Sequence, residues 1–542
     1  MTKPWVVFES PVWRWGRWCL LGFLALRVVF WLTAFPNSDE AYYWLWGQRP
    51  GFSYYDHPPF HAWVQGLFSA ALGQFFWGEA MPPPLVLRLP NVISSGVLGF
   101  TFYRICHYLY GDQRGDQRGN QGRDRFWIVL LLGMASPLYF WYLGLAWNDH
   151  WLVTWAVVSS FLFVRYVDRS VEHPGQGSGW DLYGAAICLG LAGLSKYNAV
   201  FVGLGFLGLI LTDKSRRQVL RDRRLYLALG LLALVLSPIL IWNVQNDFFS
   251  FQFYRDRTTG DGLSLNLLQP VVFLALGGLT LGPIQSWGIG RLLRTGGRTS
   301  LTRQSCYPAL ALGVFGLSTA AFTALSTVSV ALFYWNILAY PLLFPLLSDQ
   351  FYRPQGQTLV RKWQMAIAQG VGLFAATVLV VYYTVIPLGA FFGATDPDGA
   401  ALFGWPQIAE AVEAQAQGID DPLLLTTDYR SASALAYTLN NPNVLAISGR
   451  LDQFDFWYDA PALEGRDGVL LGETWHPICP THLAMFDRVD PGETVTVRRF
   501  GRVLQTYEIV RGYGFRAGPE GYPLSPDYPL AFTSDGERCL PD

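Results

Sequence analysis

Apolar residues along the first 390 positions come in long runs that short polar stretches separate. The runs have about 15 to 22 residues, which is the length of an α-helix that crosses a bilayer. The first run, Cys19–Phe35, lacks the small-residue cleavage site of a signal peptide, so we interpret it as a span. The pattern predicts eleven spans, at residues 18–36, 89–107, 127–146, 150–165, 181–195, 199–212, 225–244, 269–289, 307–326, 330–348 and 364–386.

The pattern changes after the last span to short strands and helices. Two apolar strands flank a helix with apolar spacing, and a strand–helix–strand with short turns indicates a parallel pair. A hairpin is expected near the C-terminus. The predicted elements are the strand Pro422–Thr427, the helix Arg430–Leu439, the strand Asn443–Ser448 and a hairpin over Thr494–Phe515 around Gly501.

Two parts of the chain therefore differ in pattern, and they differ in charge as well. We expect an all-α polytopic membrane bundle over 1–390, with a first outer loop at 37–88, and a small α/β domain over 391–542. From Pro387 to Asp542 there are 22 acidic and 10 basic residues, whereas the remainder has 18 acidic and 29 basic residues. The acidic tail argues against nucleic acid as a partner.

Lysine and arginine gather on one side of the predicted spans. The loops on that side hold 23 basic residues, against five on the other side. Cytoplasmic loops carry such an excess, so the sparse side is outside, and an odd number of spans places the tail there too. In that compartment Cys479 and Cys539 can form a disulfide, whereas the other four cysteines lie in or beside apolar runs and are interpreted as packing residues. The five outer basic residues are Arg49, Arg88, Lys196, Arg255 and Arg257.

The first outer loop begins with an acidic pair, Asp39 and Glu40, directly after the first span. A helix follows, which Asn37 or Ser38 can cap. Its aromatic face predicts a position in the membrane interface, with Trp and Tyr at headgroup depth. A carboxylate held there can take a proton from an acceptor hydroxyl, or it can simply be a helix cap or a solvated acid. The two interfacial helices are expected over 39–48 and from Pro58 to about Phe76.

The residues around this acidic pair resemble the first loop of the GT-C glycosyltransferases. These polyprenyl-phosphate-sugar-dependent membrane enzymes include the protein O-mannosyltransferases and the lipid A aminoarabinose transferase (glycosyltransferase families 39 and 83). The resemblance covers most of the chain in the same order, and the tail segment Asp428–Trp457 is similar to the outer domain of bacterial members. The matching motifs are Arg27 in the first span, Asp39-Glu40-Ala41-Tyr42-Tyr43-Trp44-Leu45-Trp46, Tyr54-Tyr55-Asp56-His57-Pro58-Pro59, Arg88-Leu89-Pro90 and Leu194-Ser195-Lys196.

The resemblance implies that Asp39 is the general base, which deprotonates the acceptor for attack on the anomeric carbon with inversion. The leaving group is then a polyprenyl phosphate, whose negative charge needs fixed cations. Lys196 suits that role, because it is the only basic residue between Gly175 and Thr212 and is costly at the end of a span without an anionic partner. The alternative is a lysine that snorkels to the interface.

Other residues receive roles from the same resemblance. Asp149, between the third and fourth spans, matches a second acidic residue near the family's active site, or else it is a turn-forming residue. A loop arginine contacts the donor phosphate in relatives, and Arg255 and Arg257 are the two candidates here. Tyr334 can donate to that phosphate or belong to an interfacial aromatic belt. The residues expected to line the substrate pocket are Glu40, Tyr43, Tyr55, Asp56, His57 and Arg88.

A metal site is a further candidate within the first loop. Asp56 and His57 have ligand types that suit a divalent metal, and the aminoarabinose transferase has a metal-site acid near this position. Adjacent residues rarely converge on one ion, so a metal is not expected. The expected ligand is the lipid-linked sugar donor itself.

Together these features predict an inverting glycosyltransferase of the bacterial inner membrane. It would move a sugar from a polyprenyl-phosphate donor to a lipid, glycan or protein acceptor outside the cytoplasm. Three alternatives are a flippase or transporter for lipid-linked sugars, an oligosaccharyltransferase of the same fold, and a scaffold without activity. A transporter would place ionisable residues near the bilayer midplane, whereas here they gather on the outer face. The presence of Asp39, Asp149 and Lys196 together argues against a scaffold.

Overall fold

The computed structural model divides the chain into two compact units, which we call the bundle unit and the sheet unit. Most of the first outer loop belongs to the same unit as the C-terminal part of the chain. These units therefore do not test the expected boundary between two domains at residue 390, which stays a prediction. The bundle unit comprises Met1–Val28, His57–His61 and Leu89–Leu379, and the sheet unit comprises Val29–Asp56, Ala62–Arg88 and Val380–Asp542. The structure describes residues 11–111, 119–173, 176–259, 265–301, 303–352, 359–392, 396–448 and 450–517.

Helices lie where the apolar runs predicted them, since every predicted span coincides with one helix or with two consecutive helices. Within the described ranges, six helices are long and apolar enough to cross a membrane, or seven if α12 and α13, bent by 113° at their break, are one span. The count of eleven spans therefore stays a prediction. The bounds are α1 (Pro11–Thr33), α4 (Pro84–Tyr110), α5 (Gly119–Met134), α6 (Pro137–Tyr142), α7 (Asp149–Glu172), α8 (Gly179–Ser195), α9 (Val200–Thr212), α10 (Arg223–Gln245), α11 (Phe249–Thr259), α12 (Leu268–Leu281), α13 (Pro283–Arg294), α14 (Tyr307–Leu325), α15 (Tyr340–Phe351) and α16 (Leu359–Thr384), with 3₁₀ helices η2 (Tyr197–Ala199), η3 (Arg216–Arg221) and η4 (Phe333–Asn336).

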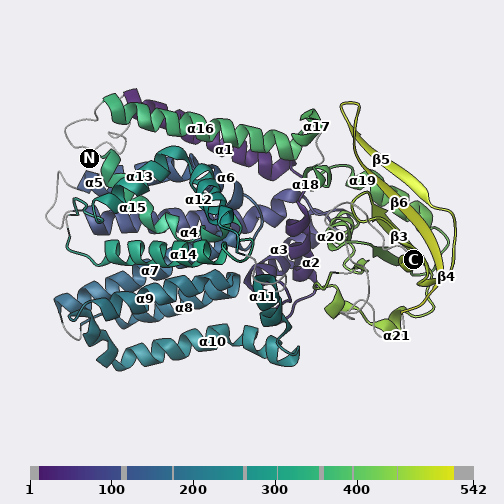
Figure 1. Cartoon of the computed structure of the whole chain (residues 1–542), viewed down its shortest axis with the longest axis horizontal. Helices are drawn as coiled ribbons and strands as arrows, with labels where there is room; N and C mark the ends of the chain where they lie inside the picture. The colour runs from purple at the N-terminus through teal and green to yellow at the C-terminus, as the bar shows by residue number, and fades with distance from the viewer. Residues whose placement is uncertain are drawn as a thin grey trace. The chain divides into compact units, whose positions relative to one another are not determined.

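Helix α7 is at the centre of the bundle unit. Of an apolar stretch of 18 residues in α7, 78% are buried, whereas only 17% of the corresponding stretch in α10 are buried. Helices α7, α8, α9 and α10 lie side by side (Figure 1). The exposed apolar surface of α10 is the kind that faces lipid. Because α7 begins at Asp149 and α8 ends at Ser195, the antiparallel packing of these two helices brings Asp149 close to Lys196.

The sheet unit contains a mixed six-stranded sheet of strand order β2-β1-β3-β6-β4, with β5 paired to β6. Strand β1 is parallel to both β2 and β3, which confirms the predicted parallel pair. The hairpin β5–β6 also has its predicted turn, where Phe500 and Gly501 have φ of 48° and 75°. The strands are β1 (Leu423–Thr426), β2 (Leu445–Ala446), β3 (Gly468–Glu473), β4 (Phe486–Val489), β5 (Glu493–Arg499) and β6 (Arg502–Phe515), and the helices after residue 388 are α17 (Gly389–Phe392), α18 (Pro397–Ala400), α19 (Trp405–Ala416), α20 (Tyr429–Thr438), η5 (Asp455–Trp457), α21 (Ala460–Leu463) and α22 (Pro480–Leu483).

The first outer loop forms the two predicted helices, α2 (Ser38–Gln48) and α3 (Phe60–Phe76). Asn37 caps α2, because its side-chain oxygen accepts from the backbone N–H of Glu40 at 2.9 Å and the Glu40 carboxylate accepts from the N–H of Asn37 at 3.1 Å. This reciprocal pair is a capping box.

The aromatic face of α2 is covered by protein, and the expectation of rings at headgroup depth stays a prediction. Trp44 and Trp46 are each 1% exposed. Helix α2 packs against α20, where Trp44 meets Tyr437 edge-on at 5.4 Å and Tyr42 meets Tyr429 at 5.1 Å. An apolar face requires a cover, and here protein supplies it.

Candidate functional site

The bundle unit holds an ion pair between Lys196 and Asp149. Lys196 Nζ donates to both carboxylate oxygens of Asp149, at 2.9 and 3.0 Å. Both side chains are buried. Asp149 is the first residue of α7, where a helix N-terminus favours a negative charge. Lys196 follows α8 in extended backbone. The structure therefore brings these two candidate site residues together in one ion pair.

One aromatic ring lies beside the ammonium group of Lys196, and two more rings pack against that ring. The Tyr334 ring lies 5.3 Å from Nζ, within the range of a cation–π contact. Tyr142 stacks on Tyr334 with ring centroids 4.5 Å apart, and Trp147 lies 6.2 Å from it. Of the three N–H groups of Lys196, Asp149 takes two, and no other acceptor for the third lies in the described part of the chain. Such a site can present one N–H to an anion.

Three histidines of the bundle unit, His57, His61 and His150, have aromatic partners within that unit. His57 contacts the Tyr254 hydroxyl at 3.1 Å through Nδ1. Arg255, next to Tyr254 on α11, is exposed, and the side chain of Arg257 lies outside the described residues. His61 and His150 meet edge-on at 5.3 Å. The sequence named His57 as a candidate pocket residue and did not indicate its tyrosine partner.

Asp39 is an acidic residue of the sheet unit whose carboxylate has no bonded partner within the described ranges. Its side chain is half-buried near the start of α2. Within the described ranges its carboxylate accepts no hydrogen bond and forms no ion pair. Burial raises the pKa of Asp39 to about 6, and the nearby Asp398 and Asp56 add to this effect, whereas Arg430 and Arg450 oppose it. A carboxylate with such a pKa can accept a proton near neutral pH.

Asp56, the other predicted acid of this loop, is buried and engaged. It accepts from the Tyr42 hydroxyl at 2.8 Å and from Arg450 at 3.2 Å. Tyr55 donates its backbone N–H to the Gln453 side chain at 2.7 Å. These hydrogen bonds connect the first outer loop to the segment after β2. Asp56 therefore stabilises the fold, whereas Asp39 forms no such bond among the described residues.

Glu40 and Arg88 form a fully buried ion pair in the same unit. The guanidinium donates to both carboxylate oxygens, at 2.7 and 2.9 Å, and to the carbonyls of Phe30 and Ala34 at 3.1 and 2.9 Å. Both side chains have an exposed fraction of 0%. The pair joins α2 to the end of α1, and its complete set of partners favours a structural role. Tyr43, also expected at the substrate pocket, is buried against Trp46 at 5.1 Å.

Replacing Arg88 by methionine should destabilise the chain by about 3–5 kcal/mol, because Glu40 would be left as a buried charge without its cation. The double variant E40M/R88M should recover most of that loss, since no uncompensated charge remains. The measurement is the thermal unfolding midpoint of the purified full-length chain in detergent. An R88M midpoint equal to that of the wild type would contradict the stabilising role of the pair.

The metal site and the disulfide are the two remaining candidate features. The described residues contain no group of three or more His, Cys, Asp or Glu side chains arranged to hold a metal ion. Asp56 and His57, although adjacent, bind different partners. Cys479 is buried and disulfide-bonded, whereas its predicted partner, Cys539, lies outside the described residues.

Sequence reasoning missed the arginines near Asp39. Arg430 lies at the start of α20, and Arg450 stacks over the Tyr429 ring at 4.6 Å. Both belong to the tail segment Asp428–Trp457, whose likeness to bacterial relatives was the one pointer toward them. Their effect on Asp39 depends on the packing of α2 against α20, which no local pattern predicts.

The chain is similar to known glycosyltransferases in sequence and in fold. Residues 56–242 match the family model described as dolichyl-phosphate-mannose-protein mannosyltransferase. The lipid A galacturonosyltransferase RgtD of Rhizobium johnstonii is 24% identical over 79% of this chain and 83% of its own length.

Solved structures of ArnT from Cupriavidus metallidurans have the same fold. The structure bound to undecaprenyl phosphate matches with a TM-score of 0.59 and 15% identity, and the alignment covers 92% of this chain and 98% of that one. The apo structure matches with a TM-score of 0.56 and 14% identity, over 93% and 98%. The apolar helices agree with a multi-pass membrane protein. The chain therefore has the fold of ArnT, and its sequence is similar to those of glycosyltransferases that include the lipid A galacturonosyltransferase and the protein mannosyltransferases.

Proposed function

We propose that the chain transfers one sugar from a polyprenyl-phosphate donor to an acceptor hydroxyl, with inversion at the anomeric carbon. The observation that carries the proposal is the carboxylate of Asp39, half-buried, without a hydrogen-bond partner in the described ranges, and with a pKa of about 6. The undecaprenyl phosphate bound by ArnT supports the class of donor.

The proposed reaction gives each residue a defined task. Asp39 takes the proton of the acceptor hydroxyl, and the acceptor oxygen attacks the anomeric carbon. The bond between that carbon and the phosphate oxygen breaks, and the electron pair leaves with the polyprenyl phosphate. Lys196, which Asp149 orients, donates to the phosphate as its negative charge develops. The Tyr334 ring lies beside the ammonium group of Lys196. One of Arg255 and Arg257 adds a second positive charge at the phosphate.

The place of the reaction is part of the same proposal. The count of 23 basic residues against five supports an active site on the extracytoplasmic side of a bacterial inner membrane. We further propose that residues 391–542 act as an outer domain that helps to select the acceptor. Because the curated relative acts on lipid A, lipid A is the first acceptor to test.

The decisive experiment is a screen of polyprenyl-phosphate sugars with the purified full-length chain. Release of polyprenyl phosphate and glycosylation of the acceptor are measured for each pair of donor and acceptor, lipid A first, then glycans and peptides. We expect one donor to release one polyprenyl phosphate per sugar transferred. Transfer from nucleotide sugars in place of lipid-linked sugars would contradict the proposal, and transfer of a whole oligosaccharide would favour the en bloc alternative.

The rate of transfer should depend on pH through Asp39. Only the deprotonated carboxylate can act as the base, and the pKa is raised to about 6, so the rate should be full above about pH 7. Below the pKa it should fall about tenfold per pH unit. Initial rates at saturating donor test this, with the thermal unfolding midpoint measured at each pH as a control for folding. A rate that stays constant from about pH 7 to pH 5 would remove Asp39 as the titrating base.

A further inference from the structure

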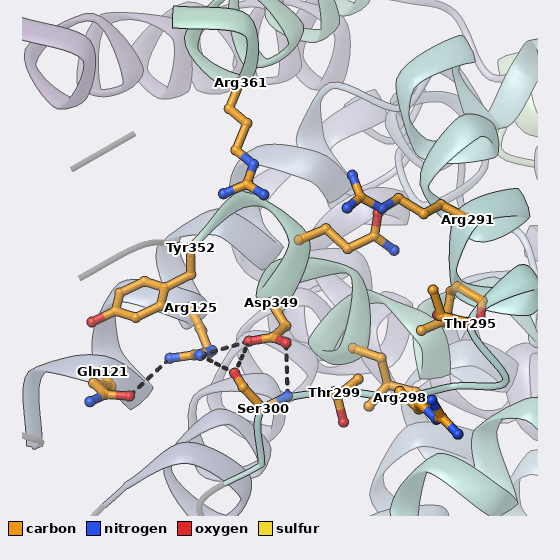
Figure 2. A pocket seen from close by; sticks show the side chains of 13 residues that line it. Gln121, Arg125, Arg291, Thr295, Arg298, Thr299, Ser300, Asp349, Tyr352 and Arg361 are labelled. Carbon is orange, nitrogen blue, oxygen red and sulfur yellow. Dashed lines mark hydrogen bonds and ion pairs between the residues drawn. The ribbon is translucent and has the colours of Figure 1, made fainter. Parts of the chain in front are cut away.

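A cavity of about 430 Å³ lies in the bundle unit where α13 and α15 end and where α5 and α16 begin. Small-molecule sites have volumes of roughly 300–1,000 Å³, so the cavity is large enough for a headgroup. Figure 2 shows arginine side chains around it that come from three helices and from the segment after α13. The charged residues that line it are Arg125, Arg291, Arg298, Arg361 and Asp349.

The charges in this cavity do not balance. Asp349 is the one carboxylate among the lining residues, against four arginines. Its oxygens already accept from Arg125 at 2.7 Å and from the backbone N–H of Ser300 at 2.9 Å. Arg291 and Arg298 are exposed, and neither forms an ion pair with any residue that the structure describes. The cavity therefore carries excess positive charge that an anion would neutralise.

Arg125 forms a rigid wall of the cavity. Its side chain is buried, and its guanidinium lies 4.0 Å from the ring centroids of both Tyr110 and Tyr352. It also donates to Gln121 and Ser300 (Figure 2). Its Nε is buried and finds no hydrogen-bond partner in the described part of the chain. A fixed arginine beside two exposed ones is a suitable arrangement for the several oxygens of one phosphate.

The cavity lies at the opposite end of α7 from Lys196. Arg303, shortly after the lining residue Ser300, pairs with Glu172 at the last turn of α7 at 2.6 Å, whereas Lys196 pairs with Asp149 at its first turn. A helix of 24 residues is about 36 Å long at 1.5 Å per residue. That length is close to the thickness of a bilayer's hydrocarbon core, about 30 Å. The cavity is therefore about one bilayer thickness from Lys196 along α7. It lies among the loops rich in Lys and Arg, where the headgroups of the leaflet on the cytoplasmic side are expected.

We propose that this arginine cavity binds a phosphate group, and that the phosphate belongs to an anionic phospholipid of that leaflet. Arginine pairs with phosphate through its planar donor fork, and basic pockets between membrane helices on the positive side bind acidic headgroups. Free inorganic phosphate offers the same chemistry and is the other source to be tested. The proposal does not depend on the glycosyl transfer, because none of the lining residues takes part in it.

The test titrates the delipidated full-length chain in detergent and counts bound lipids by native mass spectrometry. The probes are phosphatidylglycerol, phosphatidylcholine and inorganic phosphate. The variant R291Q/R298Q removes the two exposed cations. The matched control R221Q/R223Q removes two exposed arginines at the end of η3 and the start of α10, which do not line the cavity. Thermal unfolding midpoints verify that both variants are folded.

We expect the first phosphatidylglycerol to bind the wild type about 30-fold tighter than phosphatidylcholine, for two basic contacts near a headgroup. R291Q/R298Q should lose this preference, and R221Q/R223Q should keep it. Equal affinity for both lipids in the wild type, or a preference that survives in R291Q/R298Q, would overturn the proposal. If inorganic phosphate binds with the same arginine dependence and displaces the lipid at equal concentration, the phosphate site stands and the lipid source is overturned.

Discussion

Replacing Asp39 by asparagine should lower kcat for sugar transfer by about 10²–10⁴-fold, the usual contribution of a general base. Asparagine has nearly the same shape but cannot accept the acceptor's proton at neutral pH. The Asp39 carboxylate has no hydrogen-bond partner among the described residues, so the substitution breaks no bond of the fold. The unfolding midpoint and the affinity for the polyprenyl-phosphate donor should therefore be unchanged. The measurement is single-turnover transfer with saturating donor and acceptor.

The matched control for this experiment is Asp420→Asn. Asp420 is an exposed acid of the same unit, so it tests the loss of one carboxylate without loss of the base. It should keep the wild-type kcat. Wild-type turnover by D39N would remove Asp39 from the role of base, and a low unfolding midpoint of D39N would instead indicate a structural role.

Replacing Lys196 by alanine should lower kcat/KM for the donor by about 10²–10³-fold. A preorganised donor at a developing charge contributes about that much, and Lys196 is the buried cation of its region. The loss should appear both as weaker binding of free polyprenyl phosphate and as a lower rate. Binding is measured by competition with the donor, and the rate by release of polyprenyl phosphate. Unchanged kinetics would return Lys196 to the alternative of a snorkelling lysine.

The single variant K196A carries a risk, because Asp149 would be left as an uncompensated buried charge, which costs about 3–5 kcal/mol. The double variant D149N/K196M removes both charges and should fold as the wild type does. It should still fail to bind polyprenyl phosphate if Lys196 is the phosphate ligand. Lys214→Ala, at an exposed lysine between α9 and α10, is the control and should keep wild-type kinetics. Donor affinity that returns in the double variant would assign the K196A defect to folding.

The sequence by itself determined the elements that depend on local pattern. Apolar run lengths located the helices of the bundle unit, because the distance across a bilayer sets how many apolar residues a span needs. Asn37 was one of the two residues expected to cap α2, and it does so in the structure, since a helix cap needs only neighbouring residues. Gly501 similarly located the turn of the hairpin β5–β6 through its left-handed backbone. The motifs, in their order along the chain, were also enough to predict the fold family.

Only the tertiary structure decided how the charged residues pair. Three acids of the first loop, Asp39, Glu40 and Asp56, were candidate site residues in the sequence. Packing places Glu40 against Arg88 and Asp56 against Arg450, and it leaves Asp39 without a partner in the described ranges. These pairings join residues that are 48 and 394 positions apart. No helical or strand period relates such distant positions, so the periodicity of the sequence could not have predicted these pairings.

The environment of each apolar face also had to come from the structure. The aromatic pattern of α2 established that one face must leave water, but the hydrophobic effect is non-directional and does not specify the cover. The structure places α20 there, and the same contact brings Arg430 and Arg450 close enough to affect the pKa of Asp39. The sequence thus located Asp39 on its helix. Its chemical state followed only from the segments that fold around it.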